Sequence, residues 1–299
     1  MEKLYKIDIH AHAIFSELTP PHKATGMRFP LPEQLMELYD QLGIEKGVLL
    51  PLVSPEAQWF CMTNENMKQI ADQYPDRFVW FCNVDPRSGA NSANTDLSYL
   101  LEYYKSLGAK GLGELTANLY ADDPLMDNLF FHCAKCNMPV IIHISPAPGV
   151  GYGIVDDPGL PRIEKMLKKH PDLKLIGHSQ PFWAEIGKYG PEEDRNGYPK
   201  GKVEEGALPR LLRECPNLYC DLSAGSGHNA FMRDPEYAVK FLTEFQDRVF
   251  YGEDICSVTN QHPYPFKKFI EELLADGKLS ETVYRKVFRE NAVKLLGLA

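Results

Sequence analysis

The sequence predicts a closed (β/α)8 barrel. Short runs rich in β-branched and aromatic residues alternate eight times with amphipathic stretches that carry apolar residues at three-to-four spacing. The order is strand then helix throughout, and the first strand is not followed by the glycine-rich turn of a dinucleotide-binding sheet. We therefore expect a parallel barrel rather than an open doubly wound sheet.

The expected strands are short, apolar and bounded by turn residues. They cover residues 5–10, 46–52, 77–84, 109–115, 138–145, 173–179, 218–223 and 248–254. The expected helices cover residues 31–43, 64–75, 97–108, 125–137, 162–171, 207–216, 236–246 and 265–277. A further helix near 280–296 is expected to pack outside the barrel. We predict one domain over residues 1–299, with the long loops 13–30 and 179–206 over the active-site face.

Composition limits the classes of partner. The formal net charge is -9, and no run of lysine and arginine compensates for it locally, which argues against nucleic acid or an anionic membrane as a partner. The N-terminal residues do not form a secretory signal, and no stretch is apolar enough to span a bilayer. We expect a cytoplasmic protein with a small-molecule substrate. The sequence leaves the oligomeric state open, a homo-oligomer included.

Polar side chains interrupt the apolar runs where the strands end. Parallel barrel strands are buried on both faces, so an imidazole or a carboxylate within one needs a reason. All carboxyl ends of the strands meet at one mouth of a barrel, so these side chains are expected to converge there. The residues are His10, His12, Glu114, His143, His178 and Asp254.

Imidazole and carboxylate groups are ligands that suit zinc, iron and manganese. A lone strand histidine is more often a hydrogen-bonded core residue, but four histidines and two carboxylates at strand ends favour a metal site. Asp8 shares the alternation of His10 and His12 one step deeper, and we expect it to orient a ligand or to satisfy backbone donors.

These strand-end motifs resemble the amidohydrolase superfamily. The resemblance rests on DIHAH at the first strand, GELTANLYADDP at the fourth, VIIHIS at the fifth, LIGHSQPFW at the sixth and YGEDIC at the eighth. It covers the whole chain and is nearest to the amidohydrolase-related branch, which contains metal-dependent hydrolases and nonoxidative decarboxylases of the aminocarboxymuconate-semialdehyde decarboxylase type.

The resemblance implies a role for each strand-end residue. His10, His12 and His143 would be metal ligands, and Asp254 would be both a ligand and the carboxylate that transfers protons. His178 would bind a second metal ion or shuttle a proton. Glu114 stands where binuclear members usually carry a carboxylated lysine, and it would either bridge a second ion or hydrogen-bond to the ligands.

The resulting hypothesis is a metal-dependent hydrolase of the amidohydrolase superfamily. One or two divalent ions, zinc first and manganese or iron as alternatives, would activate water, with Asp254 as general base and His178 polarising the scissile carbonyl. The alternative is a nonoxidative decarboxylase, a carbon-carbon lyase in which His178 donates the proton. A non-catalytic metal-binding protein is a third interpretation.

Substrate contacts are expected from loops that follow the strands. Aromatic side chains there suggest a cyclic substrate, and an arginine suggests a carboxylate on it. The candidates are His22, Arg28, Trp59, Phe182, Trp183 and His228. Lid packing and local hydrogen bonds are competing interpretations for each of them. At the eighth strand end, Glu253 replaces the family's more frequent serine or threonine, and strand alternation places it outward.

Overall fold

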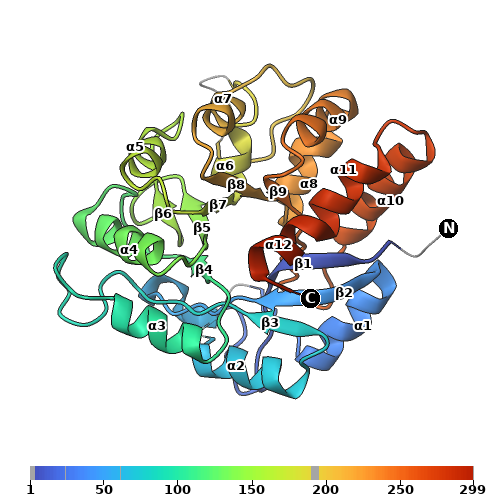
Figure 1. Cartoon of the computed structure of the whole chain (residues 1–299). Helices are drawn as coiled ribbons and strands as arrows, with labels where there is room; N and C mark the ends of the chain where they lie inside the picture. The colour runs from blue at the N-terminus through green and yellow to red at the C-terminus, as the bar shows by residue number, and fades with distance from the viewer. Residues whose placement is uncertain (1–3, 24, 61, 190–194, 299) are drawn as a thin grey trace.

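Eight parallel strands form the centre of the molecule, with helices around them (Figure 1). The computed structural model describes residues 4–23, 25–60, 62–189 and 195–298, with only the backbone of 58–60. The barrel strands are β1 (Lys6–Ala11), β2 (Ile44–Leu49), β3 (Phe78–Trp80), β4 (Leu112–Leu115), β5 (Val140–Ser145), β7 (Leu175–His178), β8 (Leu218–Asp221) and β9 (Val249–Phe250). Each corresponds to one predicted strand.

Backbone hydrogen bonds close these strands into a ring. The strands pair in the orders β1-β2-β3 and β4-β5-β7-β8-β9. Between β3 and β4, the amide of Cys82 donates to the carbonyl of Gly111 at 2.9 Å. Between β9 and β1, the amide of Ile9 donates to the carbonyl of Tyr251 at 3.0 Å. The predicted (β/α)8 barrel is therefore confirmed.

The predicted helices form the outer layer. They are α1 (Pro32–Leu42), α2 (Asn64–Gln73), α3 (Ser98–Ser106), α4 (Pro124–Lys135), α5 (Pro161–Lys169), α7 (Ala207–Glu214), α9 (Pro235–Glu244) and α10 (Pro263–Ala275). Local sequence explains several starts: Asp123 accepts from the amide of Leu125 at 2.8 Å, and Pro124 occupies the first turn of α4.

Shorter elements that the sequence did not predict lie in the connections. They are η1 (Pro55–Phe60), β6 (Ile154–Val155), α6 (Gln180–Ala184) and α8 (Ala224–Met232). The strand β6 pairs in parallel with β5, outside the ring order. The helices η1, α6 and α8 each begin within a few residues of the end of a strand, so they belong to the face of the barrel where the strands end.

The C-terminal segment differs from its prediction. It forms α11 (Glu281–Arg285), η2 (Lys286–Glu290) and α12 (Asn291–Leu296), and Figure 1 shows α12 across one end of the barrel. Ala292 and Leu296 are buried in one apolar cluster with Ile7, Ile141 and Ile176 from the barrel strands. The helix does not pack outside the barrel as expected, because its apolar side chains plug the end opposite to the strand-end histidines.

Candidate metal centre

Four side chains from three strand ends converge on one point. Nε2 of His10 and Nε2 of His12 lie 3.1 Å apart. Oε2 of Glu114 lies 3.7 Å from the first nitrogen and 3.5 Å from the second. Oδ1 of Asp254 lies 3.7 Å and 3.6 Å from the same nitrogens. The two histidines and Glu114 are buried, and the side chain of Asp254 is 16% exposed.

An irregularity in β1 turns both histidines toward this point. The pairing of β1 with β2 shifts register between Asp8 and Ala11. Asp8 therefore reaches out to the hydroxyl of Tyr39 on α1, which donates to it at 2.6 Å. Its other oxygen accepts from the amides of His10 and Glu253, each at 2.9 Å. Asp8 thus satisfies backbone donors, and the simple alternation that put it on the histidine side was wrong.

Asp254 is aimed at the histidines by its backbone. Its φ is 50°, in the left-handed region, where aspartate is tolerated better than most residues. Its amide donates to the carbonyl of His10 at 3.0 Å, which ties the end of β9 to the end of β1. Side chains are seldom held in this backbone region without compensating contacts, and such residues cluster at functional sites.

Hydrogen bonds fix which ring nitrogens face the cluster. Nδ1 of His10 lies 2.6 Å from Oδ2 of Asp221, and Nδ1 of His12 lies 3.0 Å from the carbonyl oxygen of Leu50. Both partners are acceptors, so Nδ1 carries the proton in the neutral ring and Nε2 keeps its lone pair. With both rings neutral, two lone pairs would face each other across 3.1 Å, unless a proton on Nε2 of His10 or a metal ion lies between them. A cation between them resolves that repulsion, and metal-binding histidines characteristically donate their other N–H in this way.

The distances fit one divalent cation. A metal ion about 2.0–2.1 Å from nitrogen or oxygen ligands places neighbouring ligands about 2.8–3.0 Å apart in octahedral geometry and about 3.3–3.4 Å apart in tetrahedral geometry. The two histidine nitrogens lie 3.1 Å apart, and each lies 3.5 Å to 3.7 Å from an oxygen of Glu114 and from an oxygen of Asp254. Small side-chain adjustments would bring all four to such an ion. The residues therefore fit the metal that their donor types suggest.

The charges at the site also favour a cation. Burial alone would raise the pKa of Glu114, but neighbouring histidines outweigh it and hold the pKa well below its usual value. Burial would likewise raise the pKa of Asp254, and the histidines lower it instead. Burial lowers and three nearby carboxylates raise the pKa of His10, which ends well above its usual value. Two ionised carboxylates therefore face the ring nitrogens.

His143 and His178 lie beside the four converging residues. Nδ1 of His143 lies 2.6 Å from Oε1 of Glu114, so the ring positions that carboxylate. Nε2 of His178 lies 3.7 Å from Oδ2 of Asp254. His178 also groups with His10 and Glu114 at separations that could hold an ion, whereas His143 joins no such group among the described residues.

A hydrogen-bond chain sets the state of His178. The hydroxyl of Ser223 donates to Oδ2 of Asp221 at 2.9 Å, and Nδ1 of His178 lies 2.8 Å from the same hydroxyl oxygen. The hydroxyl proton is already used, so Nδ1 of His178 donates and Nε2 is unprotonated in the neutral ring. Burial, together with nearby His10, lowers the pKa of His178 to about 4. The ring is therefore a proton acceptor at neutral pH.

Sequence reasoning missed four residues here. Asp221 ends β8, Ser223 follows it, and the two orient His10 and His178. The rule that found the other strand-end carboxylates would have found Asp221 too. Nothing in the sequence pattern indicated that Tyr152 and Cys256 would lie at this site. Tyr152 packs on the ring of His143, with 4.5 Å between ring centroids. Sγ of Cys256 lies 3.3 Å from Oδ1 of Asp254. Burial raises the pKa of Tyr152 and of Cys256 well above the usual values.

Three of the expected substrate contacts are buried elsewhere. Phe182 and Trp183 are 0% and 2% exposed and belong to the main core, because α6 begins directly after β7 and turns both rings inward. Nε1 of Trp183 donates to the carbonyl of Asp221 at 2.9 Å. His228 stacks on Phe266 of α10 at 3.9 Å. None of the three faces the converging ligands, so their predicted contact with substrate is corrected to a packing role.

The remaining expected contacts lie on other loops. Nδ1 of His22 lies 3.0 Å from the hydroxyl of Thr25 within the first loop. Arg28 is exposed and lines a hollow of about 360 Å³ that Ser257 and Thr259 also line, close to Asp254 in the chain. The side chain of Trp59 lies outside the described part of the chain. Phe29 brings the first loop to the site, with its ring 5.0 Å from that of His12.

Glu253 points outward from the barrel, as alternation predicted, but not into solvent. It is fully buried, and the hydroxyl of Tyr251 donates to it. Its other carboxylate oxygen lies 3.8 Å from Nε2 of His228 and 4.0 Å from Nε2 of His262. Nε2 of His262 also lies 2.7 Å from the carbonyl oxygen of Glu253, so that nitrogen already donates there. This group lies in the layer between barrel and helices.

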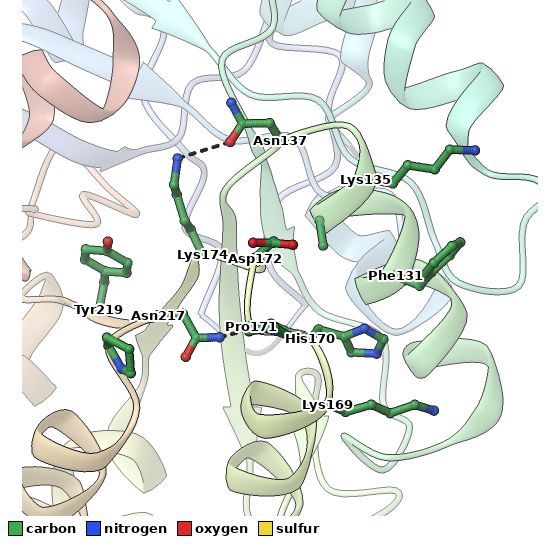
Figure 2. Close-up of a pocket in the computed structure, with 12 residues that line it drawn as sticks. Phe131, Lys135, Asn137, Lys169, His170, Pro171, Asp172, Lys174, Asn217 and Tyr219 are labelled. Carbon is green, nitrogen blue, oxygen red and sulfur yellow. Dashed lines mark hydrogen bonds between the residues drawn. The ribbon is translucent and has the colours of Figure 1, made fainter.

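A larger hollow opens at the other end of the barrel (Figure 2). Its volume is about 730 Å³, and its lining comes from segments that precede strands, such as Pro171 and Asn217. Lys174 there donates to the side chain of Asn137 at 3.1 Å. Barrel enzymes carry their chemistry where the strands end, so this hollow is not part of the candidate site.

The chain belongs to the amidohydrolase family. Residues 7–298 match the sequence profile of that family, which covers nearly the whole chain and all the strand-end residues described above. No curated protein matches the chain significantly in sequence. The family and the site together define an amidohydrolase-superfamily enzyme fold with candidate metal ligands.

Solved structures share the fold at low sequence identity. The 5-carboxyvanillate decarboxylase of Sphingomonas paucimobilis has a TM-score of 0.64 and 18% identity, over 99% of this chain and 100% of that one. The Novosphingobium aromaticivorans 5-carboxyvanillate decarboxylase, solved with manganese and a nitrobenzoic acid, has a TM-score of 0.58 and 19% identity, over 99% and 97%. A probable 2-pyrone-4,6-dicarboxylic acid hydrolase of Acinetobacter baumannii has a TM-score of 0.60 and 14% identity, over 98% of this chain and 99% of that one.

None of the described helices combines the length and the apolar character that crossing a lipid bilayer requires.

Proposed function

We propose that the protein is a divalent-metal-dependent hydrolase of a small, carboxylate-bearing substrate. The observation that carries this proposal is the position of Asp254, whose carboxylate faces His10 and His12 and also lies 3.7 Å from His178. Asp254 is ionised because its pKa is lowered, and His178 presents an unprotonated Nε2 at 3.7 Å from it. Two proton acceptors side by side suit the removal of a proton from an attacking water molecule.

The metal would be held by His10, His12, Glu114 and Asp254. We propose a single ion, because both carboxylates lie within 3.7 Å of the same two histidine nitrogens. We propose zinc as that ion, with manganese or iron able to replace it. When bound, the ion would polarise the substrate and favour deprotonation of water at neutral pH. His143 would hold Glu114 in position through their 2.6 Å contact.

The protein's own residues would move the proton. Asp254 is the partly exposed member of the set, so it can meet a substrate that enters the barrel mouth. It would take a proton from water and return it to the leaving group. Nε2 of His178 would accept a hydrogen bond from the attacking water and orient it, because the chain through Ser223 to Asp221 holds the ring with Nε2 unprotonated.

Arg28 would bind a carboxylate of the substrate. Its guanidinium is exposed at a hollow that the loop after β9 also lines, and that loop continues from Asp254. Guanidinium groups pair with carboxylates through two parallel hydrogen bonds. The proposal follows from this position and from the acids that are named for the structural neighbours.

Nonoxidative decarboxylation is the second candidate, and Tyr152 favours it. This reaction needs an acid that protonates carbon as carbon dioxide leaves. The raised pKa keeps the hydroxyl of Tyr152 protonated, and its ring packs on His143 beside the cluster. Four of the structures that share the fold are named as decarboxylases, of 5-carboxyvanillate or of 2,6-dihydroxybenzoate, which supports the same reaction.

Isotope labelling distinguishes the two reactions. The protein loaded with zinc or manganese is supplied with 2-pyrone-4,6-dicarboxylate, 5-carboxyvanillate and simple lactones, esters and amides. In water enriched in oxygen-18, hydrolysis places the label in the new carboxylate. In deuterium oxide, decarboxylation places deuterium on the ring carbon and releases carbon dioxide.

We expect oxygen-18 incorporation and no carbon dioxide. Asp254→Asn should lower kcat by about 10²- to 10⁴-fold, because the proton acceptor is lost. Asp172→Asn, at the other end of the barrel, is the matched control and should keep wild-type activity. Release of carbon dioxide and deuterium on the product would contradict the proposed hydrolysis and support nonoxidative decarboxylation.

A further inference from the structure

A second cavity lies between the helices that surround the start of β1. Its volume is about 740 Å³, and residues of α1, α10 and α11 line it. Figure 1 shows where these three helices lie. The wall is mostly apolar and aromatic, with Ile270 and Leu274 on one side and Tyr284 and Phe288 on the other. Cavities of this size and character are typical of small-molecule sites.

One buried cation lies at the base of this cavity with no carboxylate of the described residues in direct contact. Lys6 is 5% exposed, and no described residue accepts a hydrogen bond from its Nζ or forms an ion pair with it. Its nearest aromatic contact is the ring of Tyr251, with Nζ 5.0 Å from the ring centroid. A buried ammonium group normally has a paired anion, because burying an unpaired charge is costly.

The carboxylates at the rim are already paired. Asp40 lies 2.9 Å from Arg77, Glu271 lies 2.7 Å from Lys267, and Glu281 lies 3.1 Å from Arg285. Their charges are therefore largely balanced, which leaves the ammonium of Lys6 as the unbalanced charge among the described residues that line the cavity.

We propose that this cavity binds a small amphipathic carboxylate, with its head group on the ammonium of Lys6 and its apolar chain along α10. The carboxylate would supply the missing anion, and the chain would cover apolar wall that water now contacts. Burial lowers the pKa of Lys6 to about 8, although the buried carboxylate of Glu253 acts to raise it from beyond ion-pair distance, so the group is mainly charged at neutral pH.

The site is separate from the candidate metal centre. Lys6 begins β1, whereas His10 and His12 end it, and four residues of strand span about 13 Å. The ligand would enter between the helices rather than through the barrel mouth. Binding here therefore does not depend on the proposed reaction.

Titration calorimetry with decanoate tests the proposal on the full chain. We expect saturable binding of one equivalent to the wild-type protein and to His12→Ala, in which the metal cluster is incomplete. Decyltrimethylammonium, which has the same chain and the opposite charge, should not bind. Lys6→Met should weaken decanoate binding by about tenfold or more, because the charge-assisted contact is lost.

Two further variants control for packing and charge. Lys268→Met removes a positive charge from the exposed side of α10 and should bind decanoate like the wild type. Leu274→Trp fills the cavity, keeps Lys6 and should also weaken binding, so the proposal can be tested even if Lys6→Met does not fold. Thermal unfolding establishes that each variant is folded.

The opposite results would overturn the proposal. Equal affinity in Lys6→Met and wild type would show that the ammonium does not bind the head group. Loss of binding in His12→Ala alone would place decanoate at the metal cluster. Absence of saturable binding to the wild type, or preference for the cationic probe, would exclude an anionic ligand here.

Discussion

Oδ2 of Asp221 lies 2.6 Å from Nδ1 of His10, and both side chains are fully buried. The carboxylate fixes the ring so that Nε2 faces the converging ligands, and it also accepts from the hydroxyl of Ser223 at 2.9 Å. The last residue of β8 thus orients His10 directly and His178 through the hydroxyl of Ser223. Carboxylates in this position raise the basicity of metal-binding histidines.

Asp221→Asn should weaken metal binding by about 10- to 100-fold without unfolding the protein. The amide keeps the size of the carboxylate but stabilises the ring of His10 less. Dissociation constants for zinc, measured by competition with a chelator, check this. The exposed carboxylate of Asp157 offers a control in Asp157→Asn, and equal zinc affinity in all three proteins would contradict the assigned role.

Gly153→Ala should displace His143 and lower both stability and activity. A Cβ at this position would lie 2.8 Å from Cδ2 and 2.8 Å from the carbonyl oxygen of His143, and the φ of Gly153 is 111°. We expect a loss of more than about 1 kcal/mol in the free energy of unfolding by urea. Gly151→Ala is matched, since its φ is 68° with no atom nearby. Equal effects of the two substitutions would mean that contact with His143 is unimportant.

Asp156→Asn should remove part of the pH dependence of stability. Burial raises the pKa of Asp156 to about 6 from 3.8, against amide donors that include Ile163 at 2.8 Å. The folded protein then holds a proton that the unfolded chain has lost, so stability falls as pH rises from about 4 to about 6, by at most about 3 kcal/mol. Urea unfolding at pH values across this range should show a smaller fall in the variant. An equal fall of stability with pH in the wild type and in Asp156→Asn would show that Asp156 does not cause this pH dependence.

Leu296→Ala should destabilise the protein by about 2–5 kcal/mol. Leu296 is 3% exposed and belongs to the apolar cluster inside the barrel, so truncation would leave a cavity at its closed end. Lys294→Ala, on the exposed side of α12, should change stability by less than about 0.5 kcal/mol. If Leu296→Ala lowered the stability as little as Lys294→Ala does, α12 would not seal the barrel.

Much of this arrangement could be predicted from the sequence because barrel strands are so apolar. His10, His12, Glu114 and Asp254 stand out against buried strands, and the barrel brings strand ends together wherever the loops go. The same reasoning, applied to the end of β8, would have included Asp221. Alternation along a strand, by contrast, holds only while the register is regular, and β1 shifts register between Asp8 and Ala11.

Loops were harder to predict, since the same aromatic residue can face a ligand or the core. Phe182 and Trp183 were expected to contact substrate, but α6 starts immediately after β7 and folds them into the core. The apolar residues of α12 correctly predicted a helix, but the predicted position outside the barrel was wrong. A helix that is apolar on one face must cover something, but its sequence does not say whether that is the side or the end of a barrel.

The position of a bound ion tests the central claim most directly. Crystals grown with manganese and measured with anomalous scattering should show a peak within bonding distance of Nε2 of His10, Nε2 of His12 and the carboxylates of Glu114 and Asp254. A peak instead at the buried group of His228, Glu253 and His262, or no peak in active protein, would contradict the proposed metal centre.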